Sequence, residues 1–162
     1  MTIRLCPACA EAFKLTTRGL LARHGFSAIN VRHGDNSGHH TGSCAGSGNF
    51  PIGTEKGNEA ATSFAASYRA HATKLEGLPA ITVEEASADA IREARQGMTR
   101  RNQNIQGYLT ADDFKATSYR GWFSEASLSN RREGLQRRRE AVIAGLRATA
   151  TALDEAVASF AN

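Results

Sequence analysis

The sequence predicts a mainly α-helical protein with a small zinc-binding module, of the zinc-finger or zinc-ribbon kind, in its N-terminal third. Two observations lead to this fold class. Cys6 and Cys9 form a Cys-x-x-Cys pair in a chain whose third cysteine, Cys44, lies in a glycine-rich segment, and apolar residues after residue 54 recur at helical spacing. The 162 residues have room for a small module and a helical part. We expect a zinc-binding module at 1–50 and an α-helical domain at 54–162.

The composition favours thin helical packing over a thick core. Hydrophobic residues make up 41% of the chain, but many are alanine, and aromatic residues reach only 7%. A helical bundle or a coiled-coil-like hairpin suits this composition better than one large catalytic fold. No run of about 18 apolar residues is present to cross a bilayer, and the start lacks the apolar core of a secretory signal. We expect a cytoplasmic protein with no membrane partner, whose three cysteines bind metal or stay free rather than form disulfides.

The module is the more basic part of the chain. The formal net charge is +4, and residues 1–53 hold five basic residues against two acidic ones. This surplus permits binding to nucleic acid or to an acidic partner but does not require it. The five basic residues are Arg4, Lys14, Arg18, Arg23 and Arg32.

Cys6 and Cys9 provide one half of a tetrahedral zinc site, because a Cys-x-x-Cys turn places two sulfurs on one side of the ion. We expect His24 to come from the last turn of a short helix over residues 16–24, capped by Thr16 or Thr17. Cys44 is the preferred fourth ligand because a thiolate binds zinc well and this is the remaining cysteine. The alternatives are His33, His39 and His40. The segment from 25 to 48 reads as a loop that the metal orders at both ends.

A longer pattern surrounds these ligands. It consists of Cys6-Pro7-Ala8-Cys9, Phe13, Leu15-Thr16, Gly19-Leu20-Leu21, His24 and Cys44-Ala45-Gly46-Ser47-Gly48. The pattern resembles small zinc-binding modules found in uncharacterised proteins of bacteriophages and other mobile elements. The resemblance covers less than a third of the chain, and it implies one Zn²⁺ held by three cysteines and one histidine, a viral or mobile-element origin, and the host cytoplasm as location.

The pattern departs from a two-Cys, two-His zinc finger. The spacing from Cys9 to His24 is too long by two residues, and a second histidine soon after His24 is missing. This argues against reading three bases per finger in the major groove. With Asp35 and Asn36, the histidines at 33, 39 and 40 also resemble a hydrolytic cluster, but a glycine-rich loop rarely preorganises a catalytic group. We therefore expect no enzyme, and a zinc-assisted nuclease is the outside alternative.

The first helix is expected from about Thr54 to Glu76, with Pro79 ending it. Its apolar face consists of Phe64, Tyr68, His71 and Leu75. The second helix starts at a capping box formed by Thr82 and Glu85, and its apolar face consists of Val83, Ala86, Ala90, Ala94 and Met98. Thr110 with Asp113 marks a further helix start. Trp122 and Phe123 after it are expected to be core anchors rather than a stacking platform.

Asn130 with Glu133 is expected to cap the last and longest helix. Its apolar stripe comprises Leu135, Val142, Ile143, Leu146, Leu153, Val157 and Phe160. Such a stripe must be covered, either by the helix at 54–76 or by a second copy of the chain in a homodimer. The sequence leaves both arrangements open.

The stretch RREGLQRRRE at 131–140 has two interpretations. Alternating charges, with Glu133 one turn before Arg137, favour a solvated face, and Arg139 within the stripe would extend its head to water. A phosphate-tracking ridge is the alternative. Candidate contacts to nucleic acid or a partner are Arg18, Arg23, Arg32, Arg131, Arg132 and Arg138.

The favoured function is a non-catalytic adaptor or inhibitor that binds a macromolecular complex of a host cell or phage, including defence systems. That setting comes from the resemblance. The alternative is a nucleic-acid-binding protein that uses the basic module and the arginine clusters.

Overall fold

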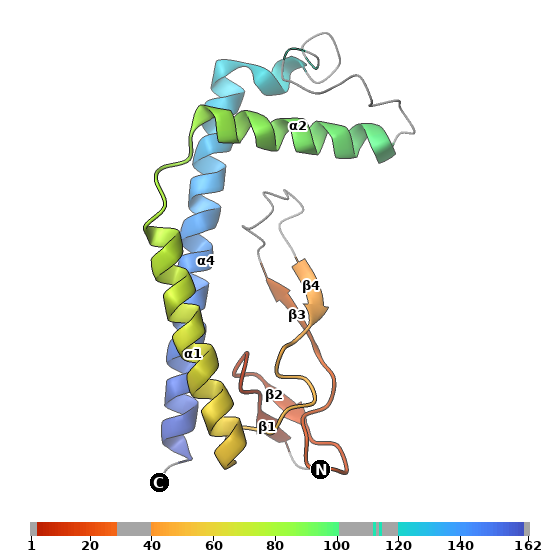
Figure 1. The fold of residues 1–162 in the computed structure, drawn as a ribbon. Coiled ribbons are helices and arrows are strands. Elements are labelled where there is room, and N and C mark those ends of the chain that lie inside the picture. Colours follow the sequence, from red (N-terminus) through yellow and green to blue (C-terminus); the bar gives the residue numbers. More distant parts are fainter. Residues whose placement is uncertain (1–2, 29–39, 101–111, 113, 115–119, 161–162) are drawn as a thin grey trace. The chain divides into compact units, whose positions relative to one another are not determined.

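The computed structural model describes residues 3–28, 40–100, 112, 114 and 120–160 (Figure 1). It confirms a mainly helical fold with a small N-terminal Cys/His module and short strands. The elements are β1 (Ile3–Leu5), β2 (Ala12–Lys14), β3 (Gly25–Ala28), β4 (His40–Ser43), α1 (Glu55–Glu76), α2 (Val83–Arg100), the 3₁₀ helix η1 (Arg120–Phe123) and α4 (Glu125–Ser159). None of the helices in these residues is long and apolar enough to cross a membrane.

The chain packs as two compact units. One contains the four strands, α1 and the second half of α4, and the other contains α2, η1 and the first half of α4, with the division after Glu140. This grouping follows contacts rather than sequence order, because α4 contributes to both units. The sequence-based boundaries of 1–50 and 54–162 stay a prediction.

Two short antiparallel hairpins form the N-terminal module. β1 pairs with β2, with Ile3 opposite Lys14, and β3 pairs with β4, with Gly25 opposite Ser43. The second hairpin corrects the expectation that 25–48 is wholly a loop. The two strands, GFSA and HTGS, contain one β-branched residue, Thr41, so their composition does not predict strands. Pairing of their backbones forms the hairpin.

The expected short helix over residues 16–24 is absent from the structure. Leu15 and Leu21 instead form an isolated bridge, and the amide of Gly19 donates to the carbonyl of Thr16 (3.0 Å) within a tight turn. Gly19 has a φ of 76°, a left-handed conformation that glycine adopts without strain and that no helix contains. The Thr16 hydroxyl accepts from Leu20 N (3.3 Å), so it stabilises this turn rather than a helix start.

The predicted helix at 54–76 is confirmed as α1. Thr54 is its N-cap and accepts from the amide of Gly57 (3.1 Å), and Gly77 ends the helix two residues before Pro79. Arg69 pairs with Asp154, and Arg147 pairs with Glu76 (2.7 Å), so the second half of α4 runs antiparallel to α1. An apolar cluster joins them, with the buried members Ile52, Ala61, Ala65, Ala150, Leu153 and Ala156.

The stripe of the last helix is therefore covered in part by α1, as one of the two sequence-based arrangements predicted. Leu153 is fully buried, but Phe160 remains 44% exposed, with its ring against the backbone of Gly53. The prediction that α4 starts at Asn130 with Glu133 is wrong. The helix starts at Glu125, and the hydroxyl of Ser124 accepts from Ser127 N (3.3 Å) as the cap. Serine caps as well as asparagine, so pattern alone could not choose between the two starts.

The second unit has its own small core, formed by Ala90, Ala94, Phe114 and Phe123. The rings of Phe114 and Phe123 stack with their centroids 5.7 Å apart, which confirms Phe123 as a core anchor. The capping box is confirmed, since Thr82 N donates to Glu85 Oε2 (2.8 Å) and Glu85 N donates to Thr82 Oγ1 (3.2 Å).

Ala86, Ala90 and Ala94 are buried as predicted, whereas Val83 is 46% exposed. Val83 occupies the first turn, where the helix has not yet reached the core. The side chain of Met98, and Thr110 with Asp113, lie outside the described residues.

Candidate metal centre

The two hairpins bring four ligand residues together. Cys6 and Cys9 lie in the turn between β1 and β2, His24 directly precedes β3, and Cys44 directly follows β4. Their ligand atoms all lie within 4.8 Å of one another. All four residues preferred from the sequence therefore meet at one point and could hold a metal ion.

The spacing of these atoms suits a four-coordinate ion. The sulfurs of Cys6 and Cys44 are 3.8 Å apart, and Cys9 Sγ lies 3.7 Å from His24 Nε2. A tetrahedron with metal–sulfur bonds of about 2.3 Å has edges of roughly 3.8 Å. An ion held by all four side chains would have no open position for water or a substrate.

Backbone hydrogen bonds hold the cysteine turn in place. Ala8 N donates to Cys6 Sγ (3.4 Å), Ala10 N donates to Cys6 O (3.0 Å), and Cys6 N donates to the carbonyl of Glu11 (2.9 Å). Ala10 takes a φ of 60°, so the chain reverses sharply after Cys9. On the other side of the site, Cys44 N donates to His24 O (3.0 Å). This bond joins the two ligand residues at the open end of the second hairpin.

His24 is oriented by three contacts. Its Nδ1 donates to Ala22 O (2.9 Å), which leaves the lone pair of Nε2 for a metal ion. Its ring stacks on Phe13, with centroids 3.6 Å apart. Ser47 Oγ donates to His24 O (2.8 Å) and accepts from His24 N (3.0 Å). The sequence pattern included Ser47 but gave it no role, since a hydroxyl that binds backbone has no spacing signature.

Gly46 allows Cys6 to approach the second hairpin. A Cβ at position 46 would lie 2.2 Å from Cys6 Sγ, well inside contact distance. Gly46→Ala should therefore displace Cys6 and weaken metal affinity by at least about tenfold, a loss of about 1.4 kcal/mol. Competition with a chromogenic chelator would measure it. Ala45→Ser, at the exposed neighbouring position, is the matched control and should bind as tightly as the wild type.

Without a cation, the three thiols cannot ionise together. The pKa of Cys6 is lowered to about 5, chiefly because the Cys9 thiol donates to its sulfur, while burial acts in the opposite direction. The same hydrogen bond raises the pKa of Cys9, and burial adds to the increase. Burial also raises the pKa of Cys44, and the charge on Cys6 adds to it. A bound cation is what would allow all three to be thiolates.

Metal affinity should consequently fall as the pH falls. At neutral pH Cys9 and Cys44 must each lose a proton before they bind a cation, so binding should release at least two protons per ion. The affinity should drop by about 100-fold per pH unit on acidification near neutrality. Calorimetric titrations in buffers of different ionisation enthalpy would count the protons. Release of fewer than two would contradict the assignment of both sulfurs as ligands.

The site is anchored to α1. Tyr68 OH donates to Ala8 O (2.7 Å) within the cysteine turn, and Phe64 packs against the cluster of Cys6, Ala8, Leu21 and Cys44. Burial raises the pKa of Tyr68, and nearby cysteine charge adds to the increase. Phe64 and Tyr68 were predicted to form the core face of this helix, but their contact with the metal module was missed because sequence separation hides it.

The structure does not test the other ligand candidates. His33 and His39 lie outside the described residues, as does the side chain of His40, whose backbone belongs to β4. Arg32 is likewise outside them. Arg18 and Arg23 are exposed on the module.

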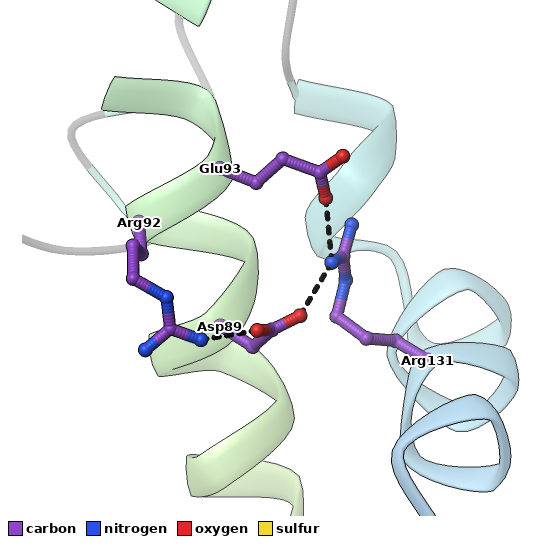
Figure 2. Close-up of polar contacts among 4 residues, drawn as sticks. All are labelled: Asp89, Arg92, Glu93 and Arg131. Carbon is purple, nitrogen blue, oxygen red and sulfur yellow. Dashed lines mark hydrogen bonds and ion pairs between the residues drawn. The ribbon is translucent and has the colours of Figure 1, made fainter. Parts of the chain in front are cut away.

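The arginines of α4 divide into paired and exposed groups. Arg131 donates to Asp89 (2.7 Å) and to Glu93 (2.7 Å), and Arg92 pairs with the other oxygen of Asp89 (Figure 2). Burial acts to lower the pKa of Arg131, but the two carboxylates outweigh it and raise the pKa above its ordinary value. The solvated interpretation is therefore wrong for Arg131, because acidic residues of α2 lie opposite it.

The other arginines of the 131–140 stretch differ in their exposure to water. Arg137 pairs with Glu133 at 3.6 Å on the exposed surface, as the spacing predicted, and Arg132 is exposed. Arg139 is only 7% exposed and donates to Pro79 O (2.6 Å), so its head does not reach water as expected. The Pro79 carbonyl, just after α1, accepts the hydrogen bond that water was expected to accept from Arg139.

Comparison of the chain with protein-family models, with curated proteins and with solved structures finds no match. The resemblance to phage zinc modules therefore stays a prediction.

Proposed function

We propose that this protein is a non-catalytic, zinc-containing adaptor or inhibitor that acts by binding another macromolecular complex. The observation that carries the proposal is the closed set of four ligands, whose atoms lie within 4.8 Å of one another. Four protein ligands are typical of structural metal sites, whereas catalytic zinc keeps one position for water. A structural ion would join the two hairpins of the module, which contact α1 through Tyr68 and Phe64.

Zinc is the ion that this set of ligands favours. Three thiolates and one imidazole in tetrahedral arrangement form a usual structural zinc site, and soft sulfur ligands exclude magnesium and calcium. We expect one zinc ion per chain in protein purified without added metal, measured by elemental mass spectrometry.

The resemblance of the module to phage and mobile-element proteins supports a setting in which the target is a host or viral complex, including a defence system. An adaptor needs exposed groups for its partner, and the structure offers arginines that are not all consumed in ion pairs. Arg18, Arg23 and Arg132 are exposed, whereas Arg131 is held by two carboxylates.

Nucleic-acid binding is the second candidate, and the basic module favours it. In its described residues, 3–28 and 40–50, the module has four exposed basic side chains, Arg4, Lys14, Arg18 and Arg23, against the acidic residue Glu11. The charge could contact phosphates without reading sequence. The pairing of Arg131 with acidic residues weakens the idea of a continuous phosphate-tracking ridge along α4.

One experiment separates the two candidates. Tagged, zinc-loaded protein is used as bait in a lysate of the source cells, and retained material is eluted by a salt gradient, with the Cys9→Ser variant as control. A defined protein complex that survives high salt and is lost in the variant supports the adaptor. Retention of nucleic acid that falls steeply with salt, without a protein partner, would overturn it.

A further inference from the structure

The second unit contains a cavity of about 520 Å³ that no metal-site residue lines. It opens to solvent, and its walls come from α2, η1 and the first half of α4. The lining residues are Glu93, Trp122, Ser127, Asn130, Arg131, Gly134 and Arg138. One aromatic ring, two arginines, one glutamate and two neutral polar side chains line it, so the cavity suits a polar or charged ligand rather than an apolar one.

Among the described residues that line or adjoin this cavity, the cations Arg92, Arg131 and Arg138 outnumber the anions Asp89 and Glu93 by one. Asp89, Arg92, Glu93 and Arg131 form a connected group of two carboxylates and two guanidiniums, so their charges sum to zero (Figure 2). Arg131 also lies over the Trp122 ring, with its Cζ 5.7 Å from the centroid. These contacts fix Arg131 as part of the wall. Arg138, seven residues and about two turns farther along the same face of α4, adds a positive charge that the group does not compensate.

Arg138 has an unsatisfied donor. Its Nη1 is enclosed by protein and has no hydrogen-bond partner in the described part of the chain. An enclosed guanidinium nitrogen without an acceptor is costly, because it has lost water and gained nothing in return. A guanidinium binds a carboxylate as a planar fork with two parallel hydrogen bonds. Because Arg138 lines the cavity, a carboxylate bound there would pair with its positive charge.

We propose that this cavity binds the carboxylate side chain of an Asp or Glu residue presented by the partner protein, with Arg138 as its counter-ion and Trp122 as an apolar wall. The proposal rests on the adaptor function and specifies which side chain of the partner protein the adaptor would bind. One uncompensated positive charge matches one carboxylate. A phosphate carries up to two negative charges, and the second would face Glu93 without a cation of its own.

The shape of the cavity favours a side chain over a free organic acid. Small-molecule sites bury most of their ligand in a deep pocket, whereas this cavity is open to solvent and lies on one face of α4. An acidic side chain that projects from a larger surface would reach Arg138 from the open side. Ser127 and Asn130 at the wall could then bind the neighbouring peptide groups.

The single tryptophan of the chain lies in this wall and reports on binding. The zinc-loaded 162-residue chain is titrated, at constant ionic strength, with a capped peptide that carries one glutamate between two leucines. Trp122 fluorescence should change saturably, and the matched glutamine peptide should bind at least about tenfold more weakly. Glutarate and inorganic phosphate are the comparison ligands and should also bind more weakly than the peptide.

Two variants test the cavity independently. Arg138→Gln removes the counter-ion and should weaken peptide binding at least about tenfold, whereas Arg132→Gln, an exposed arginine of the same helix that lines a different cavity, should not. Gly134→Leu fills the cavity while keeping Arg138. A Cβ at position 134 meets no atom within 4 Å, and replacing a helical glycine favours the helix, so this variant should fold and still lose binding.

The site would be overturned if Arg138→Gln and Gly134→Leu both bound the glutamate peptide as tightly as the wild type does. It would also be overturned if the wild type did not bind the peptide. Tighter binding of phosphate would assign the cavity to a phosphorylated ligand, and glutarate binding as tightly as the peptide would assign it to a free acid; either result would also overturn the proposal. A different pair of results would contradict the adaptor function while leaving the cavity site intact. In that case the peptide binds through Arg138, but the bait experiment retains no protein.

Discussion

Cys9→Ser should abolish stoichiometric metal binding and disorder the hairpins of the N-terminal module. A serine hydroxyl does not deprotonate at neutral pH and is not a zinc ligand, so three side chains would remain where four now lie within 4.8 Å. Structural zinc supplies about 10–16 kcal/mol of apparent binding free energy in small modules. The described strands are three or four residues long, and such short pairs do not persist on their own.

The helices should respond unequally to this change. α2, η1 and the first half of α4 belong to the other unit and should be retained. α1 would lose the hydrogen bond from Tyr68 to Ala8, but it keeps its apolar contacts with Ala150 and Leu153 of α4. Circular dichroism should therefore show most of the helical signal, while limited proteolysis cuts within the first 50 residues.

The wild type treated with a strong chelator is the matched control, because it should reproduce both effects without any change of sequence. One metal ion per chain in Cys9→Ser, together with an uncut N-terminal module, would contradict the assignment of Cys9 as a ligand.

Asp89→Ala should destabilise the second unit by about 3–5 kcal/mol, the usual cost of removing one partner of a buried ion pair. Asp89 is 2% exposed and is bound by both Arg92 and Arg131. Its loss leaves the half-buried Arg131 with Glu93 as its remaining partner within the group. Urea unfolding followed by Trp122 fluorescence would measure the change in this unit, since Trp122 packs against its core.

Two further variants make this result specific. Glu133→Ala removes the acidic partner of an exposed pair, whose side chains are 60% and 71% accessible, and should cost less than about 1 kcal/mol. Replacing Asp89 by leucine together with Arg131 by methionine should recover most of the stability, because both buried charges are removed and the remaining Arg92 and Glu93 are each more than a third accessible to water. A loss below about 1 kcal/mol for Asp89→Ala would mean that the network contributes little to folding.

The local signals in the sequence predicted the structure best. The capping box at Thr82 and Glu85, the helix at 54–76 and the four preferred metal ligands each depend on residues whose chemistry is specific to one arrangement. Cysteine and histidine have few roles at this spacing, and the reciprocal bonds of a capping box need two residue types three apart.

Competing local signals explain the errors. Ser124 and Asn130 are both good helix caps. The helix starts at Glu125 because the Ser124 hydroxyl also donates to the carbonyl of Gly121 in the preceding 3₁₀ helix. The residues from Thr16 to His24 have helical composition, but Gly19 turns the chain and pairing of Leu15 with Leu21 holds it. Charge alternation predicted a solvated Arg131, because the sequence does not show which acidic residues lie opposite.

Outside the metal site and the pairing of α1 with α4, long-range contacts were not predicted. The hydrogen bond from Tyr68 to Ala8 spans 60 residues, and that from Arg131 to Asp89 spans 42. Each depends on how helices pack, which no spacing rule of a single sequence encodes. The same holds for the role of Gly46, whose need for a bare Cα arises from a sulfur 40 residues earlier in the chain.

The apolar cluster of the first unit combines residues near Ile52 with residues near Leu153. During translation these two groups emerge at very different times. A ribosome that adds about 5–20 residues per second needs roughly 5–20 s for the intervening 100 or so residues. All four metal ligands are synthesised before that interval begins. Binding of a metal ion, as proposed above, would therefore order the hairpins on the nascent chain, and the end of α4 would complete the core against an already folded surface.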